Sequence, residues 1–304
     1  MKTLKLSMTL ALAMTAAYAQ MPNSHQIAQL KWYAATENAV LPTGANPQGL
    51  VFDGTSMWIA NYWDSNLYKV RPGDGALIGK YPIPDGPFNL AFDGVSIWTA
   101  NPMANSVTKV RASDGVVLAN YKTFNSPFAI AFDGVSIWVG NCGDNTVIKL
   151  NPTTGAITNS FSFATGPLGL AYDGQNMWIG YTDGSVVRVT NNTATAKVSV
   201  GSARSLAFDG VNIWATNYSG GNVSRINAAQ AAVTATIPTG AAHPTGIAFD
   251  GVNIWVANQD GGVTEIFPSG ATKMHASQIC PDGVAFDGAN IWVTNSLSNT
   301  VSKF

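Results

Sequence analysis

Apolar and polar positions alternate in an eleven-residue segment that recurs seven times along the chain, and one copy reads AFDGVSIWVGN at residues 131–141. The Asp-Gly pair favours a tight turn, because Gly tolerates a positive φ and Asp binds nearby backbone groups. The β-branched and aromatic residues after it are typical of a half-buried strand. Each copy therefore predicts a strand, a turn and a second strand. The other copies begin at Val51, Ala91, Ala171, Ala207, Ala248 and Ala285.

Two more strands complete each repeat. A third strand follows the pattern V-x-[KR]-[VIL], as at Val107-Thr-Lys-Val, and a Gly-rich turn then leads to a fourth, such as Ala76–Tyr81. Successive copies start 36 to 41 residues apart. Four antiparallel strands in a period of this length are typical of a propeller blade. The predicted fold class is all-β, a seven-bladed β-propeller of four-stranded antiparallel blades.

The last repeat stops at Phe304, at the end of its third strand. Near the other end of the chain, Glu37–Thr43 resembles the fourth strands of later repeats, such as the one starting at Ala235. We expect this N-terminal strand to complete the last blade and so to close the ring, which removes an exposed sheet edge. Residues 37–304 are then one domain.

Seven of the nine tryptophans occupy the same position in the repeat. A ladder of aromatic binding residues is one interpretation. We favour the other, in which each Trp packs between neighbouring blades, because a repeated architecture needs the same packing in every unit. These residues are Trp58, Trp98, Trp138, Trp178, Trp214, Trp255 and Trp292.

The first residues have the features of a secretory signal. A short basic start precedes an apolar run over residues 6–17, and Ala17-Tyr-Ala19 resembles a cleavage site. We predict a signal peptide at 1–19, cleaved after Ala19, an N-terminal arm at 20–36, and a secreted or periplasmic protein. The apolar run is shorter than the ~20 residues that span a bilayer, and no later segment approaches that length, so no membrane span is expected.

Composition suits a large β core, with 46% hydrophobic and 11% charged residues. The net charge of −1 gives no argument for nucleic acid or an anionic membrane as a partner. Cys142 and Cys280 fall in blades three and seven, across the ring from one another. We expect free thiols, because the separation exceeds the ~7 Å limit between the Cα atoms of a disulfide.

One set of loop residues breaks the repeat. The residue after the Pro-like position before each first strand, which we call the mouth residue, differs from blade to blade. An apolar arc in blades two to four, with Trp63 nearby, faces a polar arc in blades five to seven. This arrangement predicts a ligand funnel; the alternative is that the large side chains plug the channel. The predicted ligand-binding residues are Gln48, Trp63, Phe88, Phe128, Leu168, Arg204, Thr245 and Asp282.

Two other rings repeat almost without change. An Asn ends the second strand in six blades, which favours a structural role over a metal ring. A Lys or Arg occupies the third strand in six blades, and Glu265 interrupts the series in blade six. Such cations could hold an anion or single-stranded nucleic acid, but we favour charges that extend to solvent at the blade ends.

Residues for acid–base or metal chemistry are few. The glutamates are Glu37 and Glu265, and the three histidines lack the spacing of metal ligands. His243 and Asp282 lie on neighbouring loops and could meet near Arg204; the alternative is a solvated histidine. We predict no catalytic residue, no metal and no cofactor.

The pattern FDG-x-x-[IM]-W, followed by V-x-[KR]-[VIL], resembles the exported YVTN/NHL-type seven-bladed propellers over residues 37–304. That group includes periplasmic surface and binding proteins and, more distantly, streptogramin lyases. In the lyases a His follows the Pro before a first strand and a Glu ends the second strand. Thr245 and Asn258 occupy these positions in blade six, which argues against lyase chemistry. Gluconolactonase-like propellers hold a metal with acidic and amide groups. The Asn ring resembles the amide part of such a site, but the sequence places no Glu beside it.

The sequence thus favours an exported, non-enzymatic binding protein whose funnel takes a protein or a small amphipathic ligand. Two alternatives remain. One is a structural cell-surface protein that self-associates. The other is a lyase or lactonase-like enzyme on the same fold.

Overall fold

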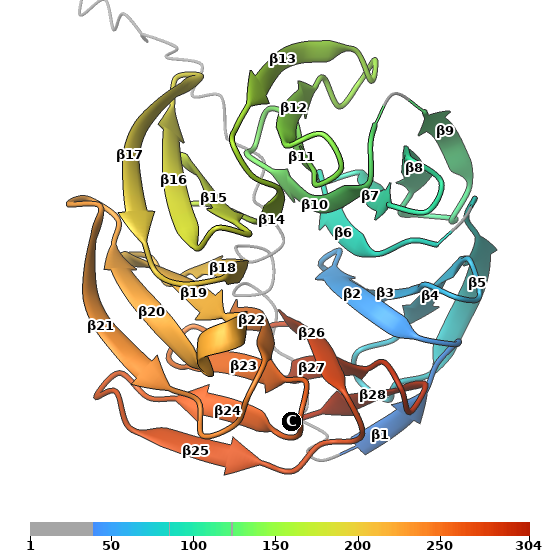
Figure 1. Ribbon diagram of the computed structural model, residues 1–304. Coiled ribbons are helices and arrows are strands. Elements are labelled where there is room, and N and C mark those ends of the chain that lie inside the picture. Colours follow the sequence, from blue (N-terminus) through green and yellow to red (C-terminus); the bar gives the residue numbers. More distant parts are fainter. Residues whose placement is uncertain (1–38, 85, 123) are drawn as a thin grey trace, which may run out of the picture.

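Seven four-stranded antiparallel sheets form a ring in the computed structural model, which describes residues 39–84, 86–122 and 124–304 (Figure 1). The seven-bladed β-propeller is confirmed. In each blade the first strand lies at the centre of the ring and the fourth at its periphery. The predicted signal peptide and N-terminal arm lie outside the described residues.

The strands follow the repeats. Blade one comprises β2 (Pro47–Phe52), β3 (Met57–Asn61), β4 (Asn66–Val70) and β5 (Leu77–Pro82). Blade two comprises β6 (Asn89–Phe92), β7 (Ser96–Asn101), β8 (Ser106–Arg111) and β9 (Val117–Tyr121). Blade three comprises β10 (Pro127–Phe132), β11 (Ile137–Asn141), β12 (Thr146–Leu150) and β13 (Ile157–Ser162). Blade four comprises β14 (Pro167–Tyr172), β15 (Met177–Tyr181), β16 (Ser185–Thr190) and β17 (Thr193–Ser199).

The second half of the ring continues the series. Blade five comprises β18 (Ala203–Phe208), β19 (Asn212–Asn217), the short 3-10 turn η1 (Tyr218–Gly220), β20 (Asn222–Asn227) and β21 (Ala232–Pro238). Blade six comprises β22 (Pro244–Phe249), β23 (Ile254–Asn258), β24 (Val263–Ile266) and β25 (Thr272–His275). Blade seven comprises β26 (Pro281–Phe286), β27 (Ile291–Asn295), β28 (Thr300–Lys303) and β1 (Ala39–Pro42).

The ring closes as the sequence predicts. β1 pairs antiparallel with β28, with Ala39 opposite Lys303 and Pro42 opposite Thr300. Leu41 packs in the core between blades seven and one, and the amide of Thr43 donates to the carbonyl of Asn299 over 2.9 Å. The last blade therefore has its fourth strand, supplied from the other end of the chain.

The turn Asp and the Trp of each repeat form one structural unit. In blade three, Asp133 Oδ1 accepts hydrogen bonds from the amides of Val135 and Ser136, while its Oδ2 accepts one from Trp138 Nε1 at 2.6 Å. Gly134 allows the turn by adopting a φ of 90°. All seven tryptophans are buried and make this bond, so the packing interpretation is confirmed. The other bonded pairs are Asp53–Trp58, Asp93–Trp98, Asp173–Trp178, Asp209–Trp214, Asp250–Trp255 and Asp287–Trp292.

The third-strand cations join neighbouring blades, and the prediction of solvent-directed charges is wrong for most of them. Lys69 Nζ lies 5.1 Å from the centre of the Trp58 ring and donates to the carbonyl of Ala112 in blade two. The charge is attracted to the face of the indole, and the ammonium satisfies a loop carbonyl. Lys109, Lys149, Arg188 and Lys303 also reach the following blade, whereas Arg225 bonds Thr234 in its own blade.

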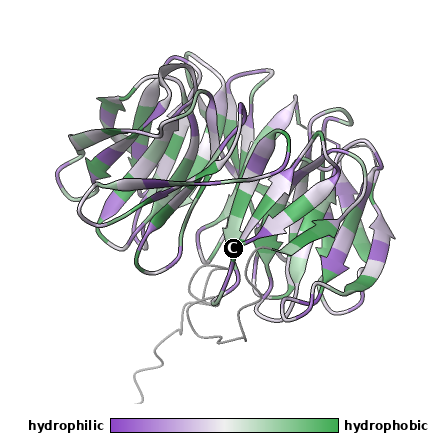
Figure 2. Cartoon of the chain, turned by 90° about the horizontal axis from the view of Figure 1, so that it is seen from below, coloured by the Kyte–Doolittle hydropathy of each residue, from purple (hydrophilic) through white to green (hydrophobic). Residues whose placement is uncertain are grey.

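Blade six replaces the cation with a different cluster. Glu265 accepts hydrogen bonds from Asn253 at 2.8 Å and pairs with His275 at 2.9 Å, and the His275 ring lies 4.9 Å from the Trp255 ring. The imidazole thus covers the indole that a Lys or Arg covers elsewhere. Alternating hydrophobic and hydrophilic segments run along the blades (Figure 2). Within the described ranges, no helix has the length and apolar character needed to cross a bilayer.

Candidate functional site

The mouth residues of six blades occupy β-bulges at the start of the first strands, whereas Phe88 of blade two directly precedes β6. In blade three the pairing with the second strand shifts between Pro127 and Ala129, so that Phe128 is the extra residue. A bulge leaves one residue unpaired and redirects its side chain. Comparable shifts occur in blades one, four, five, six and seven. The bulges therefore explain why this position escapes the repeated packing.

The backbone of the ring of mouth residues is fixed by the preceding blade. Gly49 N donates to Phe88 O over 2.8 Å, and Thr294 Oγ1 donates to Gln48 O over 2.7 Å. Asn89 Nδ2 likewise donates to Phe128 O at 2.9 Å. At Gly283 a Cβ would lie 2.3 Å from Gln48 O, so the close approach of these strands requires glycine there. These hydrogen bonds fix the main chain at the mouth residues.

Seven of the eight predicted ligand-binding residues line one pocket of about 140 Å³ at the centre of this face. They are Gln48, Phe88, Phe128, Leu168, Arg204, Thr245 and Asp282. Trp63 is not part of the lining; it lies in the loop after the second strand of blade one and is 63% exposed. The structure thus brings the mouth residues together and leaves Trp63 on the rim.

The apolar arc contains a cluster of aromatic rings. The Phe88 and Phe128 rings lie 4.3 Å apart, and Tyr62 meets Phe88 edge-on at 5.7 Å. Phe88, Phe128 and Leu168 are half-buried, so part of each side chain faces the pocket. Tyr62 extends this arc although the sequence did not assign it to the site, because the Tyr follows the repeated Asn and shares no pattern with the mouth residues.

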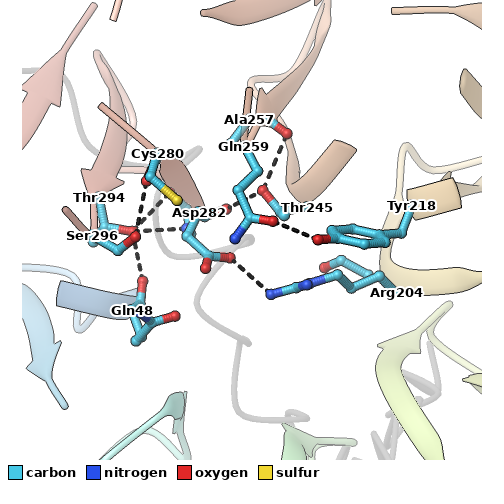
Figure 3. Close-up of polar contacts among 12 residues, drawn as sticks. Gln48, Arg204, Tyr218, Thr245, Ala257, Gln259, Cys280, Asp282, Thr294 and Ser296 are labelled. Carbon is cyan, nitrogen blue, oxygen red and sulfur yellow. Dashed lines mark hydrogen bonds and ion pairs between the residues drawn. The ribbon is translucent and has the colours of Figure 1, made fainter. Parts of the chain in front are cut away.

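The polar arc centres on an ion pair. Arg204 and Asp282 approach to 3.5 Å, and the Arg204 guanidinium lies 4.8 Å from the centre of the Tyr218 ring (Figure 3). Tyr218 in turn donates to Gln259 Oε1 at 2.6 Å. This network fixes the guanidinium between an aromatic face and a carboxylate.

Asp282 is 9% exposed, and burial raises the pKa of its carboxyl group, while Arg204 opposes that rise. Among the described residues, no donor forms a direct hydrogen bond to this carboxylate. A buried carboxylate with one ion-pair partner at 3.5 Å keeps most of its acceptor capacity. The group is therefore equipped to accept a hydrogen bond from a ligand.

Two polar residues of the ring serve the fold. The Thr245 hydroxyl is 1% exposed and contacts the carbonyls of Ala257, Pro281 and Asp282 at 3.1–3.2 Å. Gln48 is also buried, and its amide donates to Asn46 Oδ1 at 2.8 Å. The polar arc available to a ligand consequently narrows to Arg204 and Asp282.

Below the mouth, the channel becomes apolar. A second cavity of about 270 Å³ is lined by the rest of the first strands, which end in an aromatic residue in every blade. These residues are Phe52, Phe92, Phe132, Tyr172, Phe208, Phe249 and Phe286. The Arg204–Asp282 pair thus stands above a hydrophobic interior.

The residues with potential acid–base chemistry lie beside this network. His243 does not pair with Asp282; its Nδ1 pairs with Asp260 at 2.8 Å, and its ring centre lies 4.7 Å from that of Tyr218, with the two rings tilted. Asn258, which stands where the lyase pattern has Glu, is fully buried and donates to Thr264. In the part of the chain that the structure describes, no group of three or more His, Cys, Asp or Glu is arranged to hold a metal.

The Asn ring has a structural role, in which the side-chain amides mainly bond hydroxyls of the third strands. Asn101 Nδ2 donates to Ser106 and Thr108, and Asn295 Nδ2 donates to Thr300 and Ser302, on the neighbouring third strands. The two cysteines are free and half-buried, and burial raises the pKa of Cys142. Neither ring nor thiols contribute to the pocket lining.

No protein-family model and no curated protein sequence matches the chain. Solved structures do match. Hydrazine synthase of Kuenenia stuttgartiensis superposes with a TM-score of 0.74 at 18% identity, covering 89% of this chain and 97% of the other. The structure of U3-55K gives a TM-score of 0.77 at 11% identity, covering 88% and 98%. At these identities the likeness establishes the propeller fold alone.

Proposed function

We propose that this protein is an exported binding protein of the YVTN/NHL type, which holds a small amphipathic ligand at the channel mouth. The observation that carries the proposal is the pocket in which the Phe88 and Phe128 rings face the Arg204–Asp282 pair. Export rests on the signal-like residues 1–19. The repeat pattern supports the family assignment.

The pocket favours a ligand of about one ring. Its volume of about 140 Å³ is close to that of an apolar cavity of about 150 Å³ that binds benzene in another protein. The ring of the ligand would pack on Phe88 and Phe128. Such stacked aromatic contacts contribute about 0.5–1.5 kcal/mol beyond the area that they bury.

The ion pair favours a neutral head group that both donates and accepts. Asp282 can accept a hydrogen bond, and Arg204 has N–H donors to spare beyond its contact with Asp282. A charged head group would compete for one member of the pair and leave the other uncompensated, which is costly in a buried site. A primary amide attached to a ring satisfies both groups.

Saturation-transfer NMR with four ring-sized probes tests this reading. We expect benzamide to bind with a Kd on the order of 1 mM, as suits a fragment of this size, and benzylamine, benzoate and toluene to bind more weakly. Phe128→Ala should weaken benzamide about tenfold. Val135→Ala, at an exposed position in the Asp-Gly turn of blade three, is the matched control. Equal binding of all four probes, or an unchanged Kd in Phe128→Ala, would refute the proposal.

A second candidate is self-association, favoured by a different observation. The fourth strands of three consecutive blades expose apolar side chains, and a strand edge of this kind is prone to pair with another chain. The exposed residues are Leu77, Ile78, Val117, Leu118 and Ile157. Light scattering at increasing protein concentration tests this self-association. A molar mass that rises with concentration in wild type, but stays at the monomer value in Val117→Lys, would support assembly through these strands.

A further inference from the structure

Arg225 in blade five lacks the contact that Arg188, its counterpart in blade four, makes with the next blade. In both, the Nε atom donates at 3.1 Å to a threonine on the fourth strand of the same blade. A terminal nitrogen of Arg188 also donates to the carbonyl of Ala228, 3.0 Å away in blade five. The terminal nitrogens of Arg225 have no hydrogen-bond or ion-pair partner among the described residues. Its guanidinium therefore keeps donors free for another molecule.

The turn of blade six that faces Arg225 differs from those of the earlier blades. In blades one to five the pairing of the third and fourth strands shifts next to the cation, whereas the pairing in blade six has no shift. Five residues, 267–271, lie between the last paired residues of blade six, against six, 227–232, between the corresponding pair of blade five. Pro268 is the counterpart of Pro152, whose carbonyl accepts a hydrogen bond from the cation of blade two. The shorter turn explains why the Pro268 carbonyl does not reach Arg225.

A pocket of about 260 Å³ lies between Arg225 and this turn. Phe267 and Pro268 line it on the side of blade six, and its edges include Val211 and Val252. These two valines follow the Asp-Gly turns of their blades and are 64% and 65% exposed. The terminal nitrogens of Arg225 are accessible to solvent, since the side chain is half-buried and they are not among the enclosed polar atoms without a partner. A bound molecule can therefore reach the guanidinium.

Asp209 lines the same pocket, and its charge decides which kind of acceptor suits Arg225. Its two oxygens accept hydrogen bonds from two backbone amides, the Asn212 side chain and the Trp214 indole. Desolvation raises the pKa of Asp209, but these hydrogen bonds outweigh it and hold that pKa below its usual range. The group is thus charged at neutral pH, and a second carboxylate beside it would be repelled. A neutral oxygen acceptor avoids this repulsion.

Five other cations of the ring bind neutral carbonyl oxygens of this kind, each in a turn of the next blade. The acceptors are the main-chain carbonyls of Pro72, Ala112, Pro152 and Ala228 and the side-chain amide of Asn192. The contact that Arg225 lacks is therefore one that a polypeptide turn makes elsewhere in the ring.

We propose that this pocket binds a peptide segment of a partner protein, which presents a main-chain carbonyl to Arg225 and an apolar side chain to Val211 and Val252. A hydrogen bond from a charged donor is stronger than one between neutral groups, and covering the exposed valines adds apolar burial. The pocket shares no residue with the channel mouth, so this inference is independent of the function proposed above.

Three small blocked amino acids test the chemistry of this site by saturation-transfer NMR. Acetyl-phenylalanine N-methylamide offers neutral carbonyls and an apolar side chain, and we expect a Kd on the order of 1 mM. Acetyl-phenylalanine, which carries a carboxylate instead, should bind about threefold more weakly because of Asp209. Acetyl-glycine N-methylamide lacks the apolar side chain and should bind about tenfold more weakly.

Arg225→Met and Arg188→Met form a matched pair, because both arginines lie over a tryptophan and bond a threonine. Arg225→Met should weaken the phenylalanine amide about tenfold, as loss of one charge-assisted hydrogen bond allows. Arg188→Met should leave that affinity unchanged and lower the melting temperature more than Arg225→Met, since it breaks a contact between blades. Val252→Ser should weaken the probe about threefold, whereas Val135→Ser, at the same turn position in blade three, should not.

Four outcomes would overturn the proposal. The first is an unchanged affinity of the phenylalanine amide in Arg225→Met. The second is loss of binding in Phe128→Ala but not in Arg225→Met, which would place the probe at the mouth. The third is tighter binding of the carboxylate than of the amide, which would assign the pocket to an anion. The fourth is equal binding of the phenylalanine and glycine amides, or no measurable binding of either.

Discussion

The side-chain ammonium of Lys303 donates a hydrogen bond to the carbonyl oxygen of Pro72, 2.6 Å away, and so joins the last blade to the first. Lys303 is 1% exposed and lies 5.4 Å from the centre of the Trp292 ring. It repeats, across the closure, the contact that Lys69 makes between blades one and two. Closure thus uses a buried cation as well as the pairing of β1 with β28.

Replacing this cation should weaken the whole ring. We expect Lys303→Met to lower the free energy of unfolding by about 1–3 kcal/mol. A carbonyl loses its donor and the buried Asp287 loses a nearby positive charge, while relief of the burial that lowers the pKa of Lys303 offsets part of this loss. Denaturant unfolding measures the loss. Lys273→Met, on the exposed face of β25, serves as the comparison and should stay within about 0.5 kcal/mol of wild type. Similar midpoints for the two variants would contradict the assignment.

Closure by β1 predicts that a charge at one of two neighbouring residues destabilises the fold, whereas a charge at the other does not. Leu41 packs between blades seven and one, while Val40 is 47% exposed. Leu41→Asp should therefore cost about 3 kcal/mol or more, since it places a charge in an apolar core. Val40→Asp should cost well under 1 kcal/mol. Thermal unfolding of the two variants tests this prediction. Equal losses of stability would mean that β1 does not pack against the core.

The carboxyl of Asp282 makes stability depend on pH in a definite direction. Its pKa is raised in the folded state, so between the ordinary value of about 3.9 and the folded value the native protein holds more protons than the unfolded chain. Stability consequently falls as the pH rises through that window. We expect Asp282→Asn to unfold at a higher temperature than wild type at neutral pH and at a similar temperature below pH ~3. A variant that is less stable at neutral pH would show that the pair with Arg204 outweighs the cost of burial.

Substitutions of the aromatic rings at the mouth should reduce ligand affinity much more than they reduce the free energy of unfolding. Phe88 and Phe128 are half-buried, so Phe88→Ala and Phe128→Ala should each cost about 1–2 kcal/mol, below the ~3–5 kcal/mol of a fully buried Phe. Both should still lose benzamide binding. Differential scanning calorimetry beside the NMR titration tests this. Stability losses of ~3–5 kcal/mol would instead show that the two rings plug the channel and stabilise the fold.

The propeller was predictable from the sequence because the same packing is needed in every blade. Asp133, Gly134 and Trp138 recur at fixed spacing since one turn and one indole contact serve each unit. The closing strand was also predictable, because Glu37–Thr43 carries the fourth-strand pattern outside its own repeat. A repeat reveals whatever the architecture requires of each copy.

The same logic explains what the sequence did not reveal. The cation ring follows a regular pattern, but its acceptors are loop carbonyls such as Ala112 O, whose position is independent of side-chain identity. The mouth residues were located by their variability, yet which of them retain free polar groups depends on bonds like that of Thr245 to the Ala257 carbonyl.

The ring of mouth residues combines a fixed main chain with side chains that face the pocket. Its main chain is anchored through carbonyls, as at Gln48 and Phe88, whereas Phe128, Leu168 and Arg204 point their side chains into the pocket. If the mouth binds a ligand as proposed, we expect substitutions there to change its specificity with little effect on the neighbouring blades. The propeller is in this sense a display scaffold, on which selection or a designed library can exchange the recognition chemistry while the frame stays constant.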